Sequence, residues 1–203
     1  RVSVAGPAGL LACAIDQPAQ APRGVAVLCH PHPQHGGTLD NKVVQTLARA
    51  MVQLGYTSVR FNFRGVGESQ GVWDQGAGEV DDALAVVAAH RQSALPLVLG
   101  GFSFGGYVAS QVAARLAAHG QRAERVVLVG PAVLSFNTAP VPADSLVVHG
   151  ELDDVVPLAA VLDWARPQAL PVTVLPGAGH FFHGQLSVLK HMVTSAWAWQ
   201  PAA

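Results

Sequence analysis

The sequence predicts an α/β protein of three layers, with a mostly parallel central sheet covered by helices on both faces. Short apolar runs alternate with longer helical patterns, and this alternation is typical of parallel βα units. Most of the runs are unbroken by polar residues, as expected of strands that are buried on both faces. Because the 203 residues contain no linker, repeat or low-complexity tract, we expect a single domain spanning 1–203.

Six parallel strands are expected, at residues 25–29, 58–62, 97–100, 126–129, 146–149 and 172–175. Five helices are expected at about 39–54, 79–91, 104–118, 157–168 and 184–198. Asp40-Asn41-Lys42 is expected to start the first helix, and Gly55 and Gly120 to end the first and third. Residues 2–15, with Gly6-Pro7 and Gly9 at a turn, predict an antiparallel hairpin at the sheet edge.

Composition and charge exclude several classes of protein. Half of the residues are hydrophobic, which excludes a disordered chain. The net charge of −1 gives no reason to expect nucleic acid or an acidic membrane as a partner. No apolar run approaches the ~18 residues of a membrane span. Cys13 and Cys29 lie in apolar stretches and are expected to be buried reduced thiols, so we expect a cytoplasmic protein.

The strongest local signal for chemistry is Gly101-Phe-Ser103-Phe-Gly105, which is followed by Gly106. A predicted strand leads into it and a predicted helix leads out, which is the strand–elbow–helix setting of a nucleophilic serine. The helix start also offers backbone N–H groups to a developing oxyanion. The alternative is a glycine-rich turn with a capping serine.

A serine hydroxyl needs a base, and the base needs an acid that orients it. Asp153 follows the predicted strand 146–149, and His180 follows the strand 172–175 in a glycine-rich loop. The order serine, acid, histidine therefore predicts Ser103, Asp153 and His180 as a catalytic triad. Asp154 is an alternative acid, or else it caps the helix that begins near Pro157.

The segments GFSFGG, HGELDDVVP and GAGHFF resemble the nucleophile, acid and histidine segments of the α/β-hydrolase superfamily. More narrowly, HPHPQHGGTLDNKVV, RFNFRGVGESQG and WDQGAGEVDD resemble small bacterial hydrolases with dienelactone-hydrolase-like or esterase-like folds. The similarity runs from about residue 25 to about 190. It implies an α/β-hydrolase domain. Dienelactone hydrolases carry a cysteine nucleophile, and Ser103 departs from that, so their own reaction is not carried over.

The resemblance implies that the HPHP segment builds one side of the oxyanion hole. Pro31 and Pro33 have no N–H, so the backbone N–H of His32 is the expected donor, with that of Phe104 as the second. A metal site formed by His30, His32 and His35 is the alternative. No carboxylate lies close to them in sequence, and we expect neither metal nor cofactor.

Several other features are expected to be architectural. Arg64, in a Gly-Val-Gly turn, is interpreted as a loop anchor and not as a phosphate ligand, because a lone GxG is a weak nucleotide signal. Glu79, Asp81 and Asp82 lie where acids favour a helix N-terminus. Trp197 and Trp199 are expected to pack, not to stack on a ligand.

The site is expected to be open. The 16 residues 130–145, where this superfamily commonly inserts a lid, are too few for an independent cap. Four phenylalanines flank the predicted triad and are candidates for a shallow apolar cleft, with core packing as the alternative: Phe102, Phe104, Phe181 and Phe182.

These features together predict a serine hydrolase, a carboxylesterase acting on small soluble esters through an acyl-enzyme. A thioesterase or amide hydrolase would use the same triad. A non-catalytic binding protein on this fold is the alternative from another class. A complete triad in chain order favours the enzyme.

Overall fold

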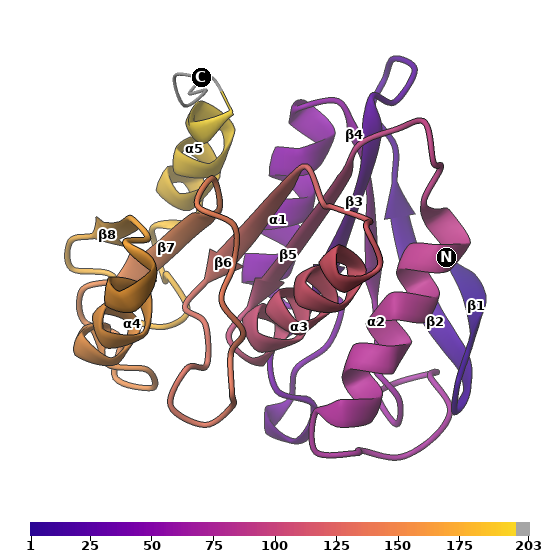
Figure 1. Cartoon of the computed structure of the whole chain (residues 1–203), viewed down its shortest axis with the longest axis horizontal. Helices are drawn as coiled ribbons and strands as arrows, with labels where there is room; N and C mark the ends of the chain where they lie inside the picture. The colour runs from indigo at the N-terminus through magenta and orange to yellow at the C-terminus, as the bar shows by residue number, and fades with distance from the viewer. Residues whose placement is uncertain (198–203) are drawn as a thin grey trace.

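The computed structural model describes residues 1–197 and contains one eight-stranded sheet in the order β1-β2-β4-β3-β5-β6-β7-β8 (Figure 1). The strands are β1 (Val2–Gly6), β2 (Gly9–Asp16), β3 (Gly24–Cys29), β4 (Tyr56–Phe61), β5 (Leu97–Phe102), β6 (Arg125–Val129), β7 (Leu146–Gly150) and β8 (Val172–Leu175). From β3 to β8 all pairings are parallel. The six predicted parallel strands are therefore confirmed.

The N-terminal hairpin is also confirmed. β1 pairs antiparallel with β2 across the Gly6–Gly9 turn, and β2 pairs antiparallel with β4. The hairpin thereby adds two strands to one edge of the parallel sheet through antiparallel pairings. The mostly parallel sheet of the sequence prediction is the sheet observed.

Helices cover both faces of the sheet, which gives the three predicted layers (Figure 1). On one face α1 (Lys42–Gln53) packs against α5 (Leu186–Ala196) over one apolar cluster. On the other face α2 (Ala77–His90), α3 (Phe104–Ala118) and α4 (Leu158–Ala165) cover a second cluster. Unbroken apolar strands are required because both faces of the sheet are buried in this way.

The helix ends follow local chemistry. Asn41 caps α1, because its side chain accepts hydrogen bonds from the backbone N–H groups of Val43 and Val44. Gly55 and Gly120 follow α1 and α3 with positive φ, as predicted. The predicted helix 157–168 is divided into α4 and a 3₁₀ turn, Arg166–Gln168, where Pro167 has no N–H to continue the α-helix.

Arg64 is a loop anchor, as predicted. Its Nε and Nη2 atoms donate to the two oxygens of the buried Asp82 carboxylate, at 3.0 and 2.8 Å. Glu79, also buried, accepts hydrogen bonds from the backbone N–H groups of Asp74 and Gly76 at the start of α2. Asp81 is exposed and pairs with Arg115 on α3.

The remaining architectural predictions concern the two cysteines and the tryptophans near the C-terminus. Cys13 and Cys29 are buried free thiols, as expected. Trp197 packs, and its indole N–H donates to the Tyr56 hydroxyl at 3.1 Å. Trp199 lies outside the described residues. Among residues 1–197, no helix combines the length and apolarity needed to cross a bilayer.

The crossover from β6 to β7 contains no helix or strand. Its 16 residues pass between α3 and α4 without forming a separate layer (Figure 1). The prediction that this segment builds no cap is therefore confirmed.

Candidate active site

Ser103 lies in a strained turn between β5 and α3. Its φ of 55° and ψ of −118° are a backbone conformation that a non-glycine residue adopts only where its surroundings impose it. The Ser103 N–H donates to the carbonyl of Val129 at 2.9 Å. The Ser103 carbonyl accepts from the N–H groups of Gly106 and Ala132. The elbow predicted from the sequence is thus present and is held by backbone hydrogen bonds.

Two glycines make room for this elbow. A Cβ atom on Gly101 would lie 2.0 Å from the carbonyl oxygen of Gly105. A Cβ atom on Gly105 would lie 2.1 Å from the carbonyl oxygen of Cys29. Both distances are far below van der Waals contact with rigid backbone. The small residues around Ser103 therefore allow α3 to begin directly against the end of β3.

His180 and Asp153 are joined by a short hydrogen bond. The His180 Nδ1 atom lies 2.7 Å from the Asp153 Oδ2 atom, and both side chains are buried. The His180 ring packs against Phe102, the residue before Ser103, with ring centroids 4.8 Å apart. The pair thus lies beside the elbow, at the carboxyl ends of the parallel strands where the sequence predicts it.

The Asp153 carboxylate is oriented through both of its oxygens. Oδ1 accepts from the backbone N–H groups of Val155 and Val156, at 3.0 and 2.7 Å, while Oδ2 faces His180. Burial alone would raise the pKa of this carboxyl, but the hydrogen bonds from His180 and Val156 outweigh burial and lower it. Asp153 is therefore ionised in the folded protein at neutral pH.

Asp154 lies in neither of the positions that the sequence left open for it. It is exposed, and the carboxylate that meets His180 is that of Asp153. The suggestion that Asp154 caps α4 is wrong, because the residue at the cap position is Pro157 and no side chain caps this helix. The turn at 153–156 directs the first of the two adjacent acids inward.

Gly130 is a site residue that the sequence analysis missed. It follows the Val129 carbonyl that holds Ser103 and has a φ of 51°. A Cβ atom there would lie 3.4–3.5 Å from atoms of the His180 ring and the Asp153 carboxylate. The backbone of Gly130 therefore lies directly against the histidine–aspartate pair. A glycine directly after a strand at the carboxyl edge was the available signal.

The HPHP loop is held by His30. This buried ring donates from Nδ1 to the Pro31 carbonyl at 2.6 Å and accepts at Nε2 from the Phe63 N–H at 3.1 Å. Burial lowers the pKa of His30 to about 4, so the ring is neutral. Because both ring nitrogens are engaged, His30 has none left for a metal. Among residues 1–197 no cluster of three or more potential metal ligands is present.

His32 and Phe104, the predicted oxyanion donors, are neighbours. Their rings lie 5.4 Å apart, which brings the HPHP loop against the first residue of α3. The His32 carbonyl accepts from the N–H groups of His35 and Gly37, and these bonds close the loop. The loop thus reaches the nucleophile side of the site from the end of β3.

Of the four phenylalanines considered for an apolar cleft, only Phe181 is exposed, at 45%. Phe102, Phe104 and Phe182 are buried core residues, so the cleft interpretation is wrong for them. Two rings that the sequence analysis did not consider, Trp73 and Phe136, pack on Phe104 at 5.2 and 4.9 Å and are partly exposed. Apolar surface near Ser103 comes from these separate loops.

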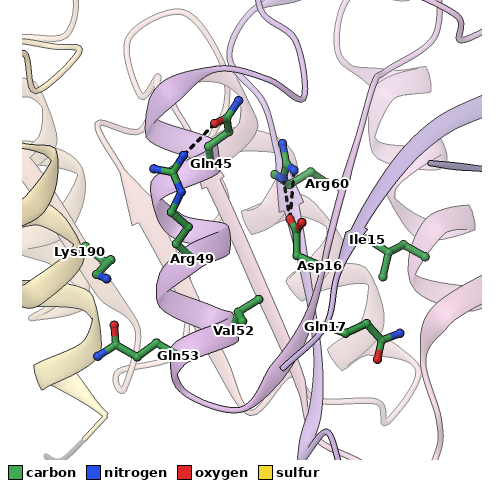
Figure 2. Close-up of a pocket in the computed structure, with 9 residues that line it drawn as sticks. All are labelled: Ile15, Asp16, Gln17, Gln45, Arg49, Val52, Gln53, Arg60 and Lys190. Atoms are coloured by element: carbon green, nitrogen blue, oxygen red, sulfur yellow. Dashed lines mark hydrogen bonds and ion pairs between the residues drawn. The ribbon is translucent and has the colours of Figure 1, made fainter. Parts of the chain in front are cut away.

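A hollow of about 650 Å³ lies away from these residues (Figure 2). It adjoins α1 and the end of β2, where Asp16 pairs with Ser58 near the start of β4. Arg60 and Asp16 form an ion pair inside it. Its lining includes none of Ser103, Asp153 and His180, so it is separate from the Ser103 site.

Comparison with known proteins assigns the family. A family model described as serine aminopeptidase, S33, matches residues 20–145, more than half of the chain. The chain belongs to this family. The matched segment includes Ser103, whereas Asp153 and His180 lie beyond it.

Two solved structures with high similarity to this chain agree with the family assignment, and one further protein is similar in sequence. An α/β serine hydrolase homologue from Coxiella burnetii is 39% identical, with a TM-score of 0.84, over 96% of this chain and 95% of that one. An α/β serine hydrolase without a lid from Xanthomonas campestris is 37% identical, with a TM-score of 0.88, over 100% and 95%. An uncharacterized protein of Rickettsia prowazekii is 33% identical over 78% of this chain and 71% of its own. The fold is that of a lidless α/β serine hydrolase, as the sequence predicted.

Proposed function

We propose that this serine hydrolase is a carboxylesterase that acts on small soluble esters, with Ser103 as nucleophile, His180 as base and Asp153 as the acid that orients it. The observation that carries the proposal is the 2.7 Å hydrogen bond between His180 and Asp153 beside the strained elbow of Ser103. Because Nδ1 of His180 donates to an ionised carboxylate, its Nε2 atom keeps a lone pair and is available as a base.

The reaction follows from these roles. The Ser103 Oγ atom attacks the ester carbonyl carbon while its proton passes to His180 Nε2. The resulting oxyanion accepts hydrogen bonds from the backbone N–H groups of His32 and Phe104, each worth about 3–4 kcal/mol in comparable enzymes. His180 then gives the proton to the departing alcohol, which leaves an acyl-enzyme. Water, deprotonated by His180, hydrolyses the acyl-enzyme and restores Ser103.

The substrate class follows from access. The segment 130–145 forms no cap, so within residues 1–197 this crossover offers no element that would close over the site and wrap a long acyl chain. Partly exposed apolar rings near the elbow, among them Phe181 and Phe136, offer a limited apolar surface. We propose short acyl esters as substrates, no cofactor, a single domain and a cytoplasmic location.

The experiment that tests the proposal is covalent labelling. A fluorophosphonate is expected to label the wild-type protein stoichiometrically at Ser103, as located by mass spectrometry of the peptide. Ser103→Ala is expected to abolish labelling and to lower ester turnover by about 10⁶-fold. An adduct on another residue, such as Ser69 or Ser110, would refute the assignment.

A panel of esters of graded acyl length, with matched thioesters and amides, then separates the leaving groups. An esterase is expected to have its highest kcat/KM on the esters. A higher value for the thioesters or amides would assign the triad to that other reaction. Absence of labelling together with no turnover of any of the three would favour a binding protein that retains the fold.

A further inference from the structure

His149, at the end of β7, is a buried histidine that the proposed triad does not use. Its side chain is fully buried. Its Nε2 atom lies 2.8 Å from the carbonyl oxygen of Val156 and 3.5 Å from Asp153 Oδ2. The ring therefore contacts the turn that carries the acid.

The contacts of His149 fix its tautomer. Both neighbours of Nε2 are acceptors, a carbonyl and a carboxylate, so Nε2 carries the hydrogen. The Nδ1 atom is then an acceptor, and it is buried without a partner in the described part of the chain. An unpartnered buried acceptor is unfavourable, and an apolar side chain would avoid it. Packing alone therefore does not explain a histidine at this position. The hydrogen bond that its Nε2–H donates does explain it.

That N–H acts on the residue that holds the carboxylate. Val156 donates its backbone N–H to Asp153 Oδ1 at 2.7 Å, and its carbonyl accepts from His149. His149 thereby holds Val156, the residue whose own N–H orients one oxygen of Asp153. It also faces the other oxygen, Oδ2, which binds His180.

Electrostatics favours a neutral ring in this position. The titratable groups that act on His149 are Asp153 and His180. Burial lowers the pKa of His149, more than offsetting the opposite effects of Val156 and Asp153. A neutral His149 presents only the dipole of its N–H to the Asp153 carboxylate. The negative charge of that carboxylate is therefore not neutralised by His149 and acts on His180.

From these contacts we propose that His149 is a positioning residue, which holds the 153–156 turn so that the Asp153 carboxylate stays directed at His180. The proposal rests on the proposed function, since it assumes that Asp153 orients a catalytic histidine. His149 itself touches neither substrate nor Ser103 in this scheme.

Two replacements separate the hydrogen bond from the volume of the ring. His149→Phe keeps the shape and removes the donor, whereas His149→Gln keeps a donor near the position of Nε2. We expect His149→Phe to lower kcat about 10- to 100-fold, the effect of losing a hydrogen bond in a charged network, with KM unchanged. We expect His149→Gln to recover most of that loss. Equal kcat values for the two variants, or a wild-type kcat for His149→Phe, would overturn the proposal.

Ser145→Ala is the matched control. Ser145 is also buried, and its hydroxyl has no partner among residues 1–197, but it precedes β7 at the end remote from Asp153. Its removal is expected to leave kcat within about twofold. Fluorophosphonate titration at the end point counts the competent sites of each variant, so that a loss of folded protein is not read as a loss of kcat.

Nuclear magnetic resonance tests His149 independently of turnover. In the wild type, ¹⁵N shifts are expected to identify the neutral Nε2–H tautomer; an Nδ1–H tautomer would overturn the proposal even if His149→Phe does not fold. The downfield proton of His180 Nδ1 is expected to shift in His149→Phe and to persist in His149→Gln. If the wild type neither hydrolyses an ester nor reacts with the phosphonate, the proposed function fails, while an altered His180 resonance still supports the positioning role.

Discussion

Ser103 and Asp153 both follow the carboxyl end of a parallel strand, yet their turns are held in place by different means. The Ser103 elbow depends on two residues without a side chain: Gly101 and Gly105 allow backbone segments to approach where a Cβ atom would clash. The Asp153 turn depends on groups that are present, because its carboxylate accepts two backbone N–H groups and one imidazole N–H. Substitutions at the elbow should therefore act through steric overlap, and those at the acid turn through charge and hydrogen bonding.

Of the changes that distinguish the elbow from the acid turn, replacement of Asp153 is expected to have the largest effect on kcat. Asp153→Asn keeps the shape of the turn, but the amide no longer favours the Nδ1–H tautomer of His180. We expect kcat to fall about 10⁴-fold, as for the equivalent change in a well-studied protease. The thermal midpoint and steady-state kinetics check that the fold persists while turnover is lost.

Asp154→Asn is the matched control for this prediction. The side chain is exposed and is not the one that meets His180, so kcat is expected to stay within about twofold. If Asp154→Asn were the damaging change and Asp153→Asn the mild one, the proposed acid would be wrong.

These adjacent acids also show where sequence reasoning reaches its limit. Ser103 and His180 were predicted because each lies in a distinctive segment between recognisable elements. The choice between Asp153 and Asp154 depends on which carboxylate can reach the N–H groups of Val155 and Val156. That is a property of the turn's three-dimensional course, and the sequence left the alternative open.

Long-range partners are the other part that the sequence does not specify. Arg64 was predicted as an anchor, but its partner Asp82 was predicted only as a helix-start acid. Phe102 and Phe104 flank Ser103 in sequence, yet the sheet and α3 bury both of them. The six parallel strands were predicted because burial on both faces leaves unbroken apolar runs, which are local signals.

Acid should destabilise the HPHP loop through His30. The pKa of this histidine is about 4 in the folded protein, where its ring is buried, and about 6.5 when unfolded. Between these values the unfolded state binds more protons, so the free energy of unfolding falls as the pH falls from 6.5 to 4. The expected loss is about 3 kcal/mol. Asp153, whose pKa is lowered, contributes stability that is lost at still lower pH.

Urea unfolding at several pH values measures this loss. His30→Gln is expected to be less stable at pH 7 and to show a flatter dependence between pH 6.5 and 4. His191→Gln, which replaces an exposed histidine on α5, is the control and should keep the wild-type slope. An unchanged slope in His30→Gln would show that other groups govern acid unfolding.

A smaller effect is expected from sterics at the elbow. In Gly105→Ala the new Cβ would lie 2.1 Å from the Cys29 carbonyl oxygen, so α3 or the end of β3 must shift. We expect a loss of about 1–3 kcal/mol in the free energy of unfolding, measured in urea. Gly179→Ala, where the nearest atom is 3.8 Å away, should change stability by less than about 0.5 kcal/mol. Equal losses in the two variants would argue against a steric role for Gly105.

The smallest expected effect is the absence of a response at a lipid interface. Interfacial activation requires an element that covers the site in water and moves aside at an interface. The crossover at 130–145 has no helix or strand from which such an element could be built, and it is tied to the elbow by the hydrogen bond from the Ala132 N–H to the Ser103 carbonyl. Hydrolysis rates followed across the solubility limit of a short-chain triglyceride series should therefore rise smoothly and level off, with no jump where the emulsion forms. A sharp increase at that point would mean that this segment rearranges at the interface, and it would remove the structural reason for proposing short soluble esters.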